Sequence, residues 1–305
     1  MTVSTSTKVK SLKKLKNTDT IFGYIFIAPV VLGFLLFILG PMIAAFIMSF
    51  SNWSLLSEFK YIGFDNYKKI LFEDETFWQV LWNTLYFSVG LVPMNLILAF
   101  GLALLLKQKL AGIGFFRTAI FTPVVTSIVV WAIIWKFIFG TEGGLINILL
   151  QYIGIKGPAW LYDTNLTMPV VIVVSVLKNL GNNMVLFLAA LYNVPEMYYE
   201  AAYLDGASSW RKMKNITLPM ISPTIFMVLI ITMIGSLKVF GQIYVLTAGG
   251  PGNATKVLVY YIYDQAFKLY EFGYASATAF ILFVIILVLT IVQWNVKKRW
   301  VHYEE

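Results

Sequence analysis

Six long apolar runs, separated by shorter polar stretches, dominate the pattern of this chain. They lie near residues 21–50, 80–106, 116–139, 168–194, 220–246 and 274–296. Each run supplies the roughly 20 apolar residues that a helix needs to cross a hydrocarbon core about 30 Å thick. Backbone groups in such a core find no water to bond, so the runs must be helical. The pattern therefore predicts an all-α, polytopic membrane protein with six transmembrane helices.

Composition agrees with this interpretation. Of 305 residues, 59% are hydrophobic and 12% are charged, whereas soluble domains carry roughly 25% charged residues. The first run follows a lysine-rich stretch, as a secretory signal peptide would. Its apolar length of about 30 residues is, however, roughly twice that of a signal-peptide core, and no small-residue cleavage site follows. We expect an uncleaved helix, with a kink near Gly40 and Pro41.

The apolar runs and the charged stretches divide the chain into four segments. We expect a polar tail over 1–20, a first helix and external segment over 21–79, a core of five helices over 80–296, and a second tail over 297–305. A short helix is predicted at 145–152, and the glycines of 249–252 predict a tight turn rather than a phosphate-binding loop, because no Lys-Ser or Lys-Thr pair follows.

Basic residues are distributed unequally between the two sides that six helices would create. One side holds five lysines of the N-terminal tail together with Lys107, Lys109, Arg117, Arg211, Lys212, Lys214, Lys297, Lys298 and Arg299. The other side holds Lys60, Lys68, Lys69, Lys156, Lys256 and Lys268. Cytoplasmic loops of membrane proteins are enriched in Lys and Arg, so both termini and the loop at 195–219 are predicted to be cytoplasmic. This bias and anionic lipid headgroups explain the net charge of +8 without a nucleic-acid partner.

Residues able to carry catalysis are missing from the apolar runs. All 15 Asp and Glu lie outside them, the one histidine is His302, and there is no cysteine. Proton relays, general acid–base pairs and metal sites are built from these residue types, so we predict no catalytic residue and no metal site. The sequence contains no Gly-Lys pair, so a phosphate-binding Walker loop is also absent. No cofactor is expected in this chain.

The few polar residues inside the runs form two groups. In the fourth run these are Lys178, Asn179, Asn182 and Asn183, and in the fifth they are Ser236, Lys238 and Gln242, close to Phe240. Helical spacing places the first group on one face, which should point into the bundle or a water-filled cavity. Amides, hydroxyls and a nearby aromatic ring suit a neutral polyol, while the two lysines leave an anionic substrate open. The alternative is hydrogen bonding between helices, worth only about 0.6 kcal/mol per bond.

The loop at 195–219 is the most informative polar segment. Pro195 suits the first position of a helix that runs to Leu204. Gly206 permits a sharp turn, and Ser208 or Ser209 can cap a second helix. The loop therefore predicts a helix–turn–helix between the fourth and fifth membrane helices.

Residues of this loop resemble the EAA loop of ABC-importer permeases. The matching positions are Glu200, Ala201, Ala202, Asp205, Gly206, Ile216, Leu218 and Pro219. Further resemblance to sugar-importer permeases lies at 66–67, 77–78, 83–84, 181–191, 238–244 and 244–252. Residue 241 is Gly where that family has Asp, which weakens the transfer of side-chain roles at that point. The likeness extends from about residue 20 to 300 and is strongest for the maltose-transporter type, with its shorter six-helix subunits.

This resemblance implies a MetI-like permease fold and an assembly. Its expected members are a second, usually non-identical permease subunit, two cytoplasmic ABC ATPases that bind ATP and Mg, and an external solute-binding protein that delivers a sugar or related polyol. In that family the EAA loop contacts the ATPase, and the helix around 181–191 helps to line the substrate site. The expected location is the inner membrane of a bacterial or archaeal cell.

Three other functions fit the sequence less well. An ion-coupled secondary transporter could use backbone carbonyls as ligands, but it would not need the EAA loop. A membrane glycosyl or lipid transferase would be favoured by an acid pair at a membrane boundary, which the sequence lacks. A signalling role remains open, as does the identity of the sugar.

Overall fold

A computed structural model of the protein describes residues 20, 22–55, 58–108, 112–298 and 300–301. Most of both predicted tails, and Lys109, lie outside the described residues. Helices are the regular elements of the described part; loops such as 153–166 and 247–257 connect them, and Ser51 and Tyr61 form an isolated bridge. Four helices are long and apolar enough to cross a membrane, or up to six if each of two bent pairs forms one span. The predicted all-α membrane architecture is confirmed.

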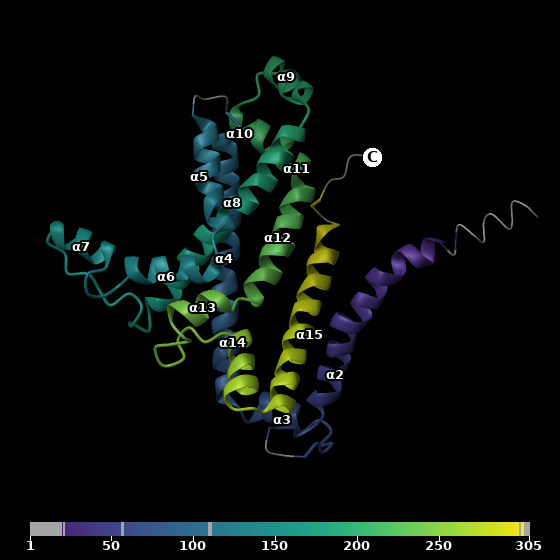
Figure 1. Ribbon diagram of the computed structural model, residues 1–305. Helices are drawn as coiled ribbons and strands as arrows, with labels where there is room; N and C mark the ends of the chain where they lie inside the picture. The colour runs from purple at the N-terminus through teal and green to yellow at the C-terminus, as the bar shows by residue number, and fades with distance from the viewer. Residues whose placement is uncertain (1–19, 21, 56–57, 109–111, 299, 302–305) are drawn as a thin grey trace, which may run out of the picture.

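Four of the six apolar runs are continuous helices. They are Phe22–Ser49, α4 (Glu75–Leu106), α8 (Thr167–Asn193) and α15 (Phe272–Lys297). The first contains a π-helical turn, η1 (Leu35–Leu39), followed by α2 (Gly40–Ser49). The backbone N–H of Gly40 bonds to the Leu35 carbonyl, and Pro41 lacks an N–H. The distortion expected near Gly40 and Pro41 is therefore this wide turn, where the helix curves (Figure 1).

The expectation of one helix over 116–139 is wrong in detail. The segment forms α5 (Ile113–Val125) and α6 (Ile128–Ile138), bent by 105°. Thr126 and Ser127 are extended, with ψ of 138° and 139°. Apolar composition predicts burial in the membrane but not straightness, so the pattern missed this break.

The run at 220–246 is also interrupted. It contains α11 (Leu218–Met220), α12 (Ser222–Leu237) and α13 (Gly241–Leu246), and residues 238–240 between the last two are not helical. Before it, α10 (Ser209–Lys212) and the π-helical turn η2 (Met213–Thr217) continue into α11, and this stretch is bent by 66° relative to α12. The predicted continuous fifth helix is therefore shorter, with a break close to its polar residues.

The packing centre is the pair α4 and α8. Val80, Phe87, Ala99 and Ala103 of α4 are completely or almost completely buried. A Cβ added to Gly181 of α8 would lie 2.5 Å from the carbonyl oxygen of Ile120, so α5 crosses α8 in direct backbone contact there. The absence of a side chain at this glycine sets the distance between the two helices.

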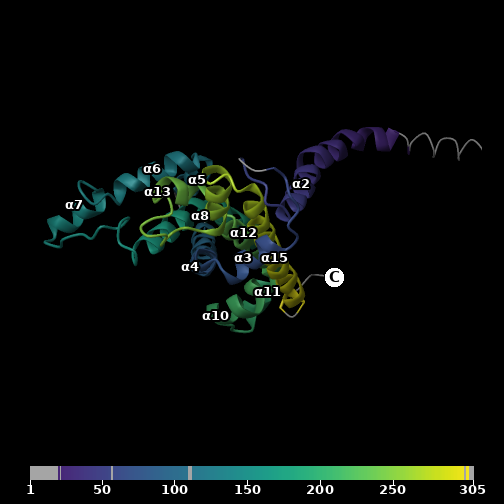
Figure 2. The ribbon, with the colours of Figure 1, turned by 90° about the horizontal axis from the view of Figure 1, so that it is seen from below.

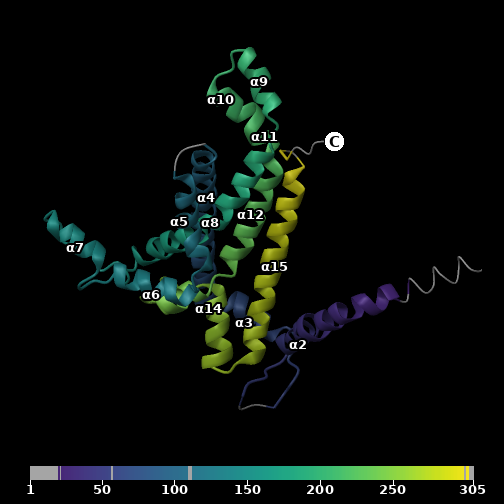
Figure 3. The same ribbon diagram turned by 45° about the horizontal axis from the view of Figure 1, so that its top comes forward.

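The two ends of the bundle carry different elements. The helix α9 (Glu196–Leu204) and α10 lie together beyond one end, while α3 (Asp65–Phe72) and α14 (Leu258–Tyr263), which continues into η3 (Asp264–Lys268), lie at the other (Figures 1 and 3). The first helix leaves the bundle on one side, and α6 with α7 (Leu145–Tyr152) leaves it on the opposite side (Figure 2). The helix predicted at 145–152 is confirmed.

Candidate functional site

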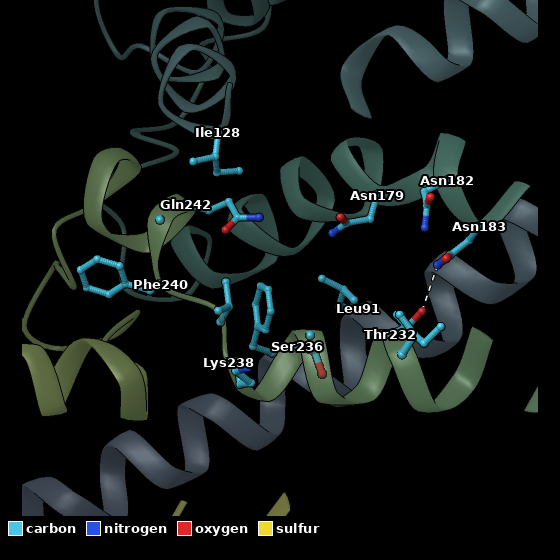
Figure 4. Close-up of a pocket in the computed structure, with 15 residues that line it drawn as sticks. Leu91, Ile128, Asn179, Asn182, Asn183, Thr232, Ser236, Lys238, Phe240 and Gln242 are labelled. Carbon is cyan, nitrogen blue, oxygen red and sulfur yellow. Dashed lines mark hydrogen bonds between the residues drawn. The ribbon is translucent and has the colours of Figure 1, made fainter. Parts of the chain in front are cut away.

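Polar side chains gather in a cavity of about 380 Å³ where α8 faces the break between α12 and α13 (Figure 4). It is lined by Phe87, Leu91, Ile128, Asn179, Asn182, Asn183, Ile231, Thr232, Gly235, Ser236, Lys238, Val239, Phe240, Gly241 and Gln242. The structure thus brings seven of the eight predicted substrate residues to one cavity. No acidic side chain is among the described residues that line it.

Several of these polar groups are available to a ligand. Within the described part of the chain, the side chains of Asn182, Lys238 and Gln242 make no hydrogen bond or ion pair. Asn179 donates its amide N–H to the Ser175 carbonyl at 3.0 Å, which leaves its amide oxygen to accept. Ser236 donates to the Met233 carbonyl at 2.8 Å. The cavity therefore offers free amide donors and acceptors and one ammonium group.

Asn183 has a different environment from its neighbour Asn182. It is buried, and its amide N–H donates to Asn95 of α4 and to Thr232 of α12, the latter at 2.9 Å. Asn95 in turn donates to the Val176 carbonyl at 3.1 Å. Asn183 therefore joins three helices. This is the interhelical hydrogen bonding that the sequence offered as the alternative to a substrate role. The sequence prediction missed Asn95 and Thr232, although a lone polar residue within an apolar run is a signal for both.

Lys178 lies outside the cavity that it was predicted to line. Its ammonium donates to the carbonyl oxygens of Pro123, Val124 and Thr126, the last two at 3.1 and 2.9 Å. These carbonyls lie at the end of α5 and in the break before α6. The Pro123 oxygen also accepts from the Thr126 backbone N–H at 3.2 Å, whereas Lys178 supplies the donor for the carbonyls of Val124 and Thr126. A cation is favourable at such a helix end. Helical spacing correctly placed Lys178 inside the bundle but did not reveal that another helix ends against it.

The break after α12 positions the fifth-run residues. Lys238 is the C-cap residue of α12 and Phe240 the N-cap residue of α13, so both come from the non-helical break that borders the cavity. The ring of Phe240 points away from Asn179 and Asn182 (Figure 4). The ring of Phe240 lies 5.4 Å from Tyr244 and 5.2 Å from Tyr263 between centroids. At Gly241, where an Asp was expected by resemblance, an added Cβ would lie 3.3 Å from Ile128. The start of α6 therefore occupies the space beside this position.

The loop at 195–219 forms the predicted helix–turn–helix. Pro195 is the N-cap of α9 rather than its first helical residue, with φ −60° and ψ 134°. Gly206 has φ +67°, a conformation that favours glycine. Ser208 caps α10 by accepting a hydrogen bond from the Arg211 backbone N–H at 3.3 Å.

Residues of the EAA motif fall into two groups by exposure. Glu200, Ala201, Asp205 and Gly206 are exposed, and Ala202 is half-buried. Glu200 lies beside Tyr203, Leu204, Lys107 and Lys212 in a shallow groove. Ile216, Leu218 and Pro219 are half-buried, and Ile216 packs against the core between α4, α8 and α12. One half of the motif is thus available to a partner, and the other anchors the loop.

The glycine-rich turn at 249–252 is held by α4. The amide N–H of Asn83 donates to the carbonyls of Asn253 and Lys256 at 2.8 and 3.0 Å, and the hydroxyl of Thr84 accepts from the Leu258 backbone N–H at 2.9 Å. These contacts support the turn that was predicted there.

Comparison with known proteins places the chain in a family. Residues 95–302 match the family described as the inner-membrane component of binding-protein-dependent transport systems. The chain belongs to this family. It is therefore an inner-membrane transport component, with the fold of those permeases.

Relatives of known name cover almost the whole chain. It is 37% identical to the arabinooligosaccharides transport system permease protein AraP of Bacillus subtilis, over 88% of this chain and 86% of the relative. It is 35% identical to the lactose transport system permease protein LacF of Rhizobium radiobacter, over 95% and 98%. A crystal structure of a bacterial alginate ABC transporter, in complex with an alginate pentasaccharide-bound periplasmic protein, matches with a TM-score of 0.83 and 27% identity, over 94% of this chain and 96% of that one.

Proposed function

We propose that this chain is the permease subunit of an ABC importer that moves a sugar or related polyol into the cytoplasm, after an external solute-binding protein delivers it. The observation that carries the proposal is the cavity at the α12–α13 break, with its free amides, one free ammonium and an adjacent aromatic ring. Sugars present hydroxyls to amides and C–H faces to rings. AraP and LacF, which match 88% and 95% of this chain, are permease proteins of arabinooligosaccharide and lactose transport systems.

Within the cavity, Asn179, Asn182 and Gln242 are the proposed hydrogen-bonding groups, Phe240 is the proposed stacking surface, and Lys238 supplies a charged donor. The lysine also accommodates an acidic sugar, as the similarity to the alginate transporter permits. Ser236 contributes mainly by shaping the cavity wall, because its hydroxyl already donates its proton to the Met233 carbonyl.

The assembly follows from the exposed half of the EAA motif. We propose that α9 docks on a cytoplasmic ATPase that binds ATP and Mg, and that a second, non-identical permease subunit completes the cavity. Both termini and α9 would then lie in the cytoplasm, on the side with more Lys and Arg.

A reconstituted transport assay tests this function. The chain would be purified with its co-expressed permease, ATPase and binding protein and placed in lipid vesicles. We expect ATP-dependent sugar uptake that requires the binding protein and not a sodium or proton gradient. Uptake that follows an ion gradient without ATP would instead identify a secondary transporter.

A coupling variant tests the loop in the same assay. Glu200→Lys should leave the permease pair assembled but release the ATPase or separate its hydrolysis from uptake, because it reverses an exposed charge on the docking face. Glu73→Lys, at an exposed residue just before α4 at the opposite end of the bundle, is the matched control for charge alone. Normal hydrolysis and uptake in Glu200→Lys would show that α9 does not couple the two.

A further inference from the structure

One side chain connects α9 to the membrane helices. No residue of α9 is buried, so the helix has no core of its own. Among its described residues, Tyr199 is the one that packs against the hydrophobic core formed by α4, α8 and α12. The Tyr203 ring of α9 lies 5.9 Å from the Lys212 ammonium of α10, which belongs to the same loop rather than to a membrane helix. The chain connections of α9 are the extended pair Val194–Pro195 and the turn at Gly206.

The hydroxyl of Tyr199 reaches the start of the fifth membrane helix. It shares a hydrogen bond of 2.8 Å with the hydroxyl of Thr217. Thr217 is buried, with 4% of its surface exposed, and it ends η2 directly before α11. A hydrogen bond to a buried hydroxyl has a fixed geometry, so displacement of Tyr199 would act on Thr217 directly.

The ring of Tyr199 reaches a second membrane helix. The ammonium of Lys107 lies 5.1 Å from its centroid, within the range of a cation–π interaction. Lys107 is the C-cap residue of α4. Tyr199 therefore contacts the ends of two membrane helices that are far apart in the sequence.

We infer that Tyr199 is the positioning residue that converts movement of α9 into movement of α4 and α12. The inference rests on the proposed docking of α9 to an ATPase. With Tyr199 in place, a push on α9 acts on α11 through Thr217 and on α4 through Lys107. Without it, α9 swings on Pro195 and Gly206, and the push is absorbed in the loop.

The test separates coupling from folding. In the reconstituted complex, Tyr199→Phe keeps the ring and loses the hydroxyl, while Thr217→Val removes the same hydrogen bond from the other side. Both should assemble normally and retain ATP hydrolysis stimulated by the loaded binding protein. Each should lower the sugar transported per ATP by roughly threefold to tenfold, the scale of one hydrogen bond. Tyr199→Ala should lower it further, because the ring contacts are also lost.

A double-mutant cycle makes the test specific. If the hydrogen bond is the link, Tyr199→Phe combined with Thr217→Val should be no worse than either alone. Tyr198→Phe removes a hydroxyl from the adjacent, 42% exposed tyrosine and should leave sugar per ATP unchanged. The role of Tyr199 would be overturned if the losses of sugar per ATP in Tyr199→Phe and Thr217→Val were additive. It would also be overturned if Tyr198→Phe lowered sugar per ATP as much as Tyr199→Phe, or if Tyr199→Ala transported as much sugar per ATP as the wild type.

Glu200→Lys separates the docking of α9 from the role of Tyr199. If Glu200→Lys uncouples transport and Tyr199→Ala does not, α9 contacts the ATPase but Tyr199 does not transmit its movement. If Glu200→Lys leaves coupling intact, α9 is not the docking element, and the inference about Tyr199 falls with it.

Discussion

At the scale of residues, two adjacent asparagines serve different purposes. Asn182 faces the cavity with a free amide, whereas Asn183 is buried and bonded to Asn95 and Thr232. Helical spacing alone treats them as equivalent because they lie on neighbouring positions of one face. The helices packed around them decide that Asn182 can bind a ligand and that Asn183 connects α8 to α4 and α12.

Substitution by leucine should therefore affect the two differently. Asn182→Leu should weaken sugar transport by roughly tenfold without loss of assembly, because one hydrogen bond to substrate is worth about 0.5–1.5 kcal/mol. Asn183→Leu should instead lower the thermal stability of the purified complex, since the buried side-chain oxygens of Asn95 and Thr232 lose their donor. Transport kinetics and melting temperature, measured on both variants, check this. Equal loss of stability in the two variants would contradict a ligand-facing Asn182.

Lys178 shows how one charge can hold a break in a helix. Its ammonium donates hydrogen bonds to three carbonyl oxygens at the junction of α5 and α6. Lys178→Met should expose these carbonyls to an apolar side chain at a cost of about 1–3 kcal/mol for an unsatisfied group. The melting temperature should fall by several degrees, and Lys178→Arg should recover part of it. Lys136→Met, on an exposed residue of α6, is the control. An unchanged melting temperature in Lys178→Met would show that the break holds without it.

At the scale of elements, Asp74 ties together the end of the bundle opposite α9. Its carboxylate caps α4 by accepting from the Phe77 backbone N–H at 3.2 Å, and it also accepts hydrogen bonds from the hydroxyls of Tyr261 in α14 and Tyr274 in α15. Burial alone would raise the pKa of Asp74. The hydrogen bonds from the two tyrosines and the backbone outweigh it and hold the pKa below its ordinary value of 3.8.

This lowered pKa predicts a pH-dependent stability. A carboxyl whose pKa is lower in the folded state adds stability above the unfolded pKa and loses it as pH falls through the folded value. Asp74→Asn should therefore melt at a lower temperature than the wild type at neutral pH, and the difference should shrink below about pH 4. Glu73→Gln, an exposed neighbour, should show no such effect. A difference that stays constant with pH would mean that the charge of Asp74 is not what stabilises the cluster.

At the scale of the whole molecule, the two ends of the bundle must face opposite sides of the membrane. The chain contains no cysteine, so single cysteines report on topology directly. Ser209 begins α10 at the end that carries α9, and Lys60 precedes α3 at the opposite end; both are exposed. In intact cells, a membrane-impermeant thiol reagent should label Lys60→Cys but not Ser209→Cys. After permeabilisation it should label both. Labelling of Ser209→Cys in intact cells would reverse the proposed orientation.

The first helix and the α6–α7 arm show that the bundle is not self-contained. The most apolar 18-residue window of Phe22–Ser49 has none of its residues buried within the chain. Val129, Val130 and Phe137 of α6 are likewise exposed. In a membrane these surfaces contact lipid or other subunits, which agrees with a transport component that works in an assembly.

What the sequence determined by itself is the class of molecule and the parts that depend on local pattern. Apolar length determined the membrane helices, and glycine, proline and serine at fixed positions determined the turn at Gly206 and the cap at Ser208. These features depend on residues close together in the chain, so their physical causes are visible in the sequence.

The tertiary structure alone decided what depends on distant neighbours. It decided that α5 and α6 meet at 105° against Lys178 and that α12 ends at Leu237. It also decided that Asn183 donates to Asn95 while the side chain of Asn182 faces the cavity. It also placed Tyr199 between Lys107 and Thr217. The contacts of Lys178, Asn183 and Tyr199 join residues that are far apart in the sequence. Apolar patterning indicates which residues are buried from water but not which helix will pack beside them.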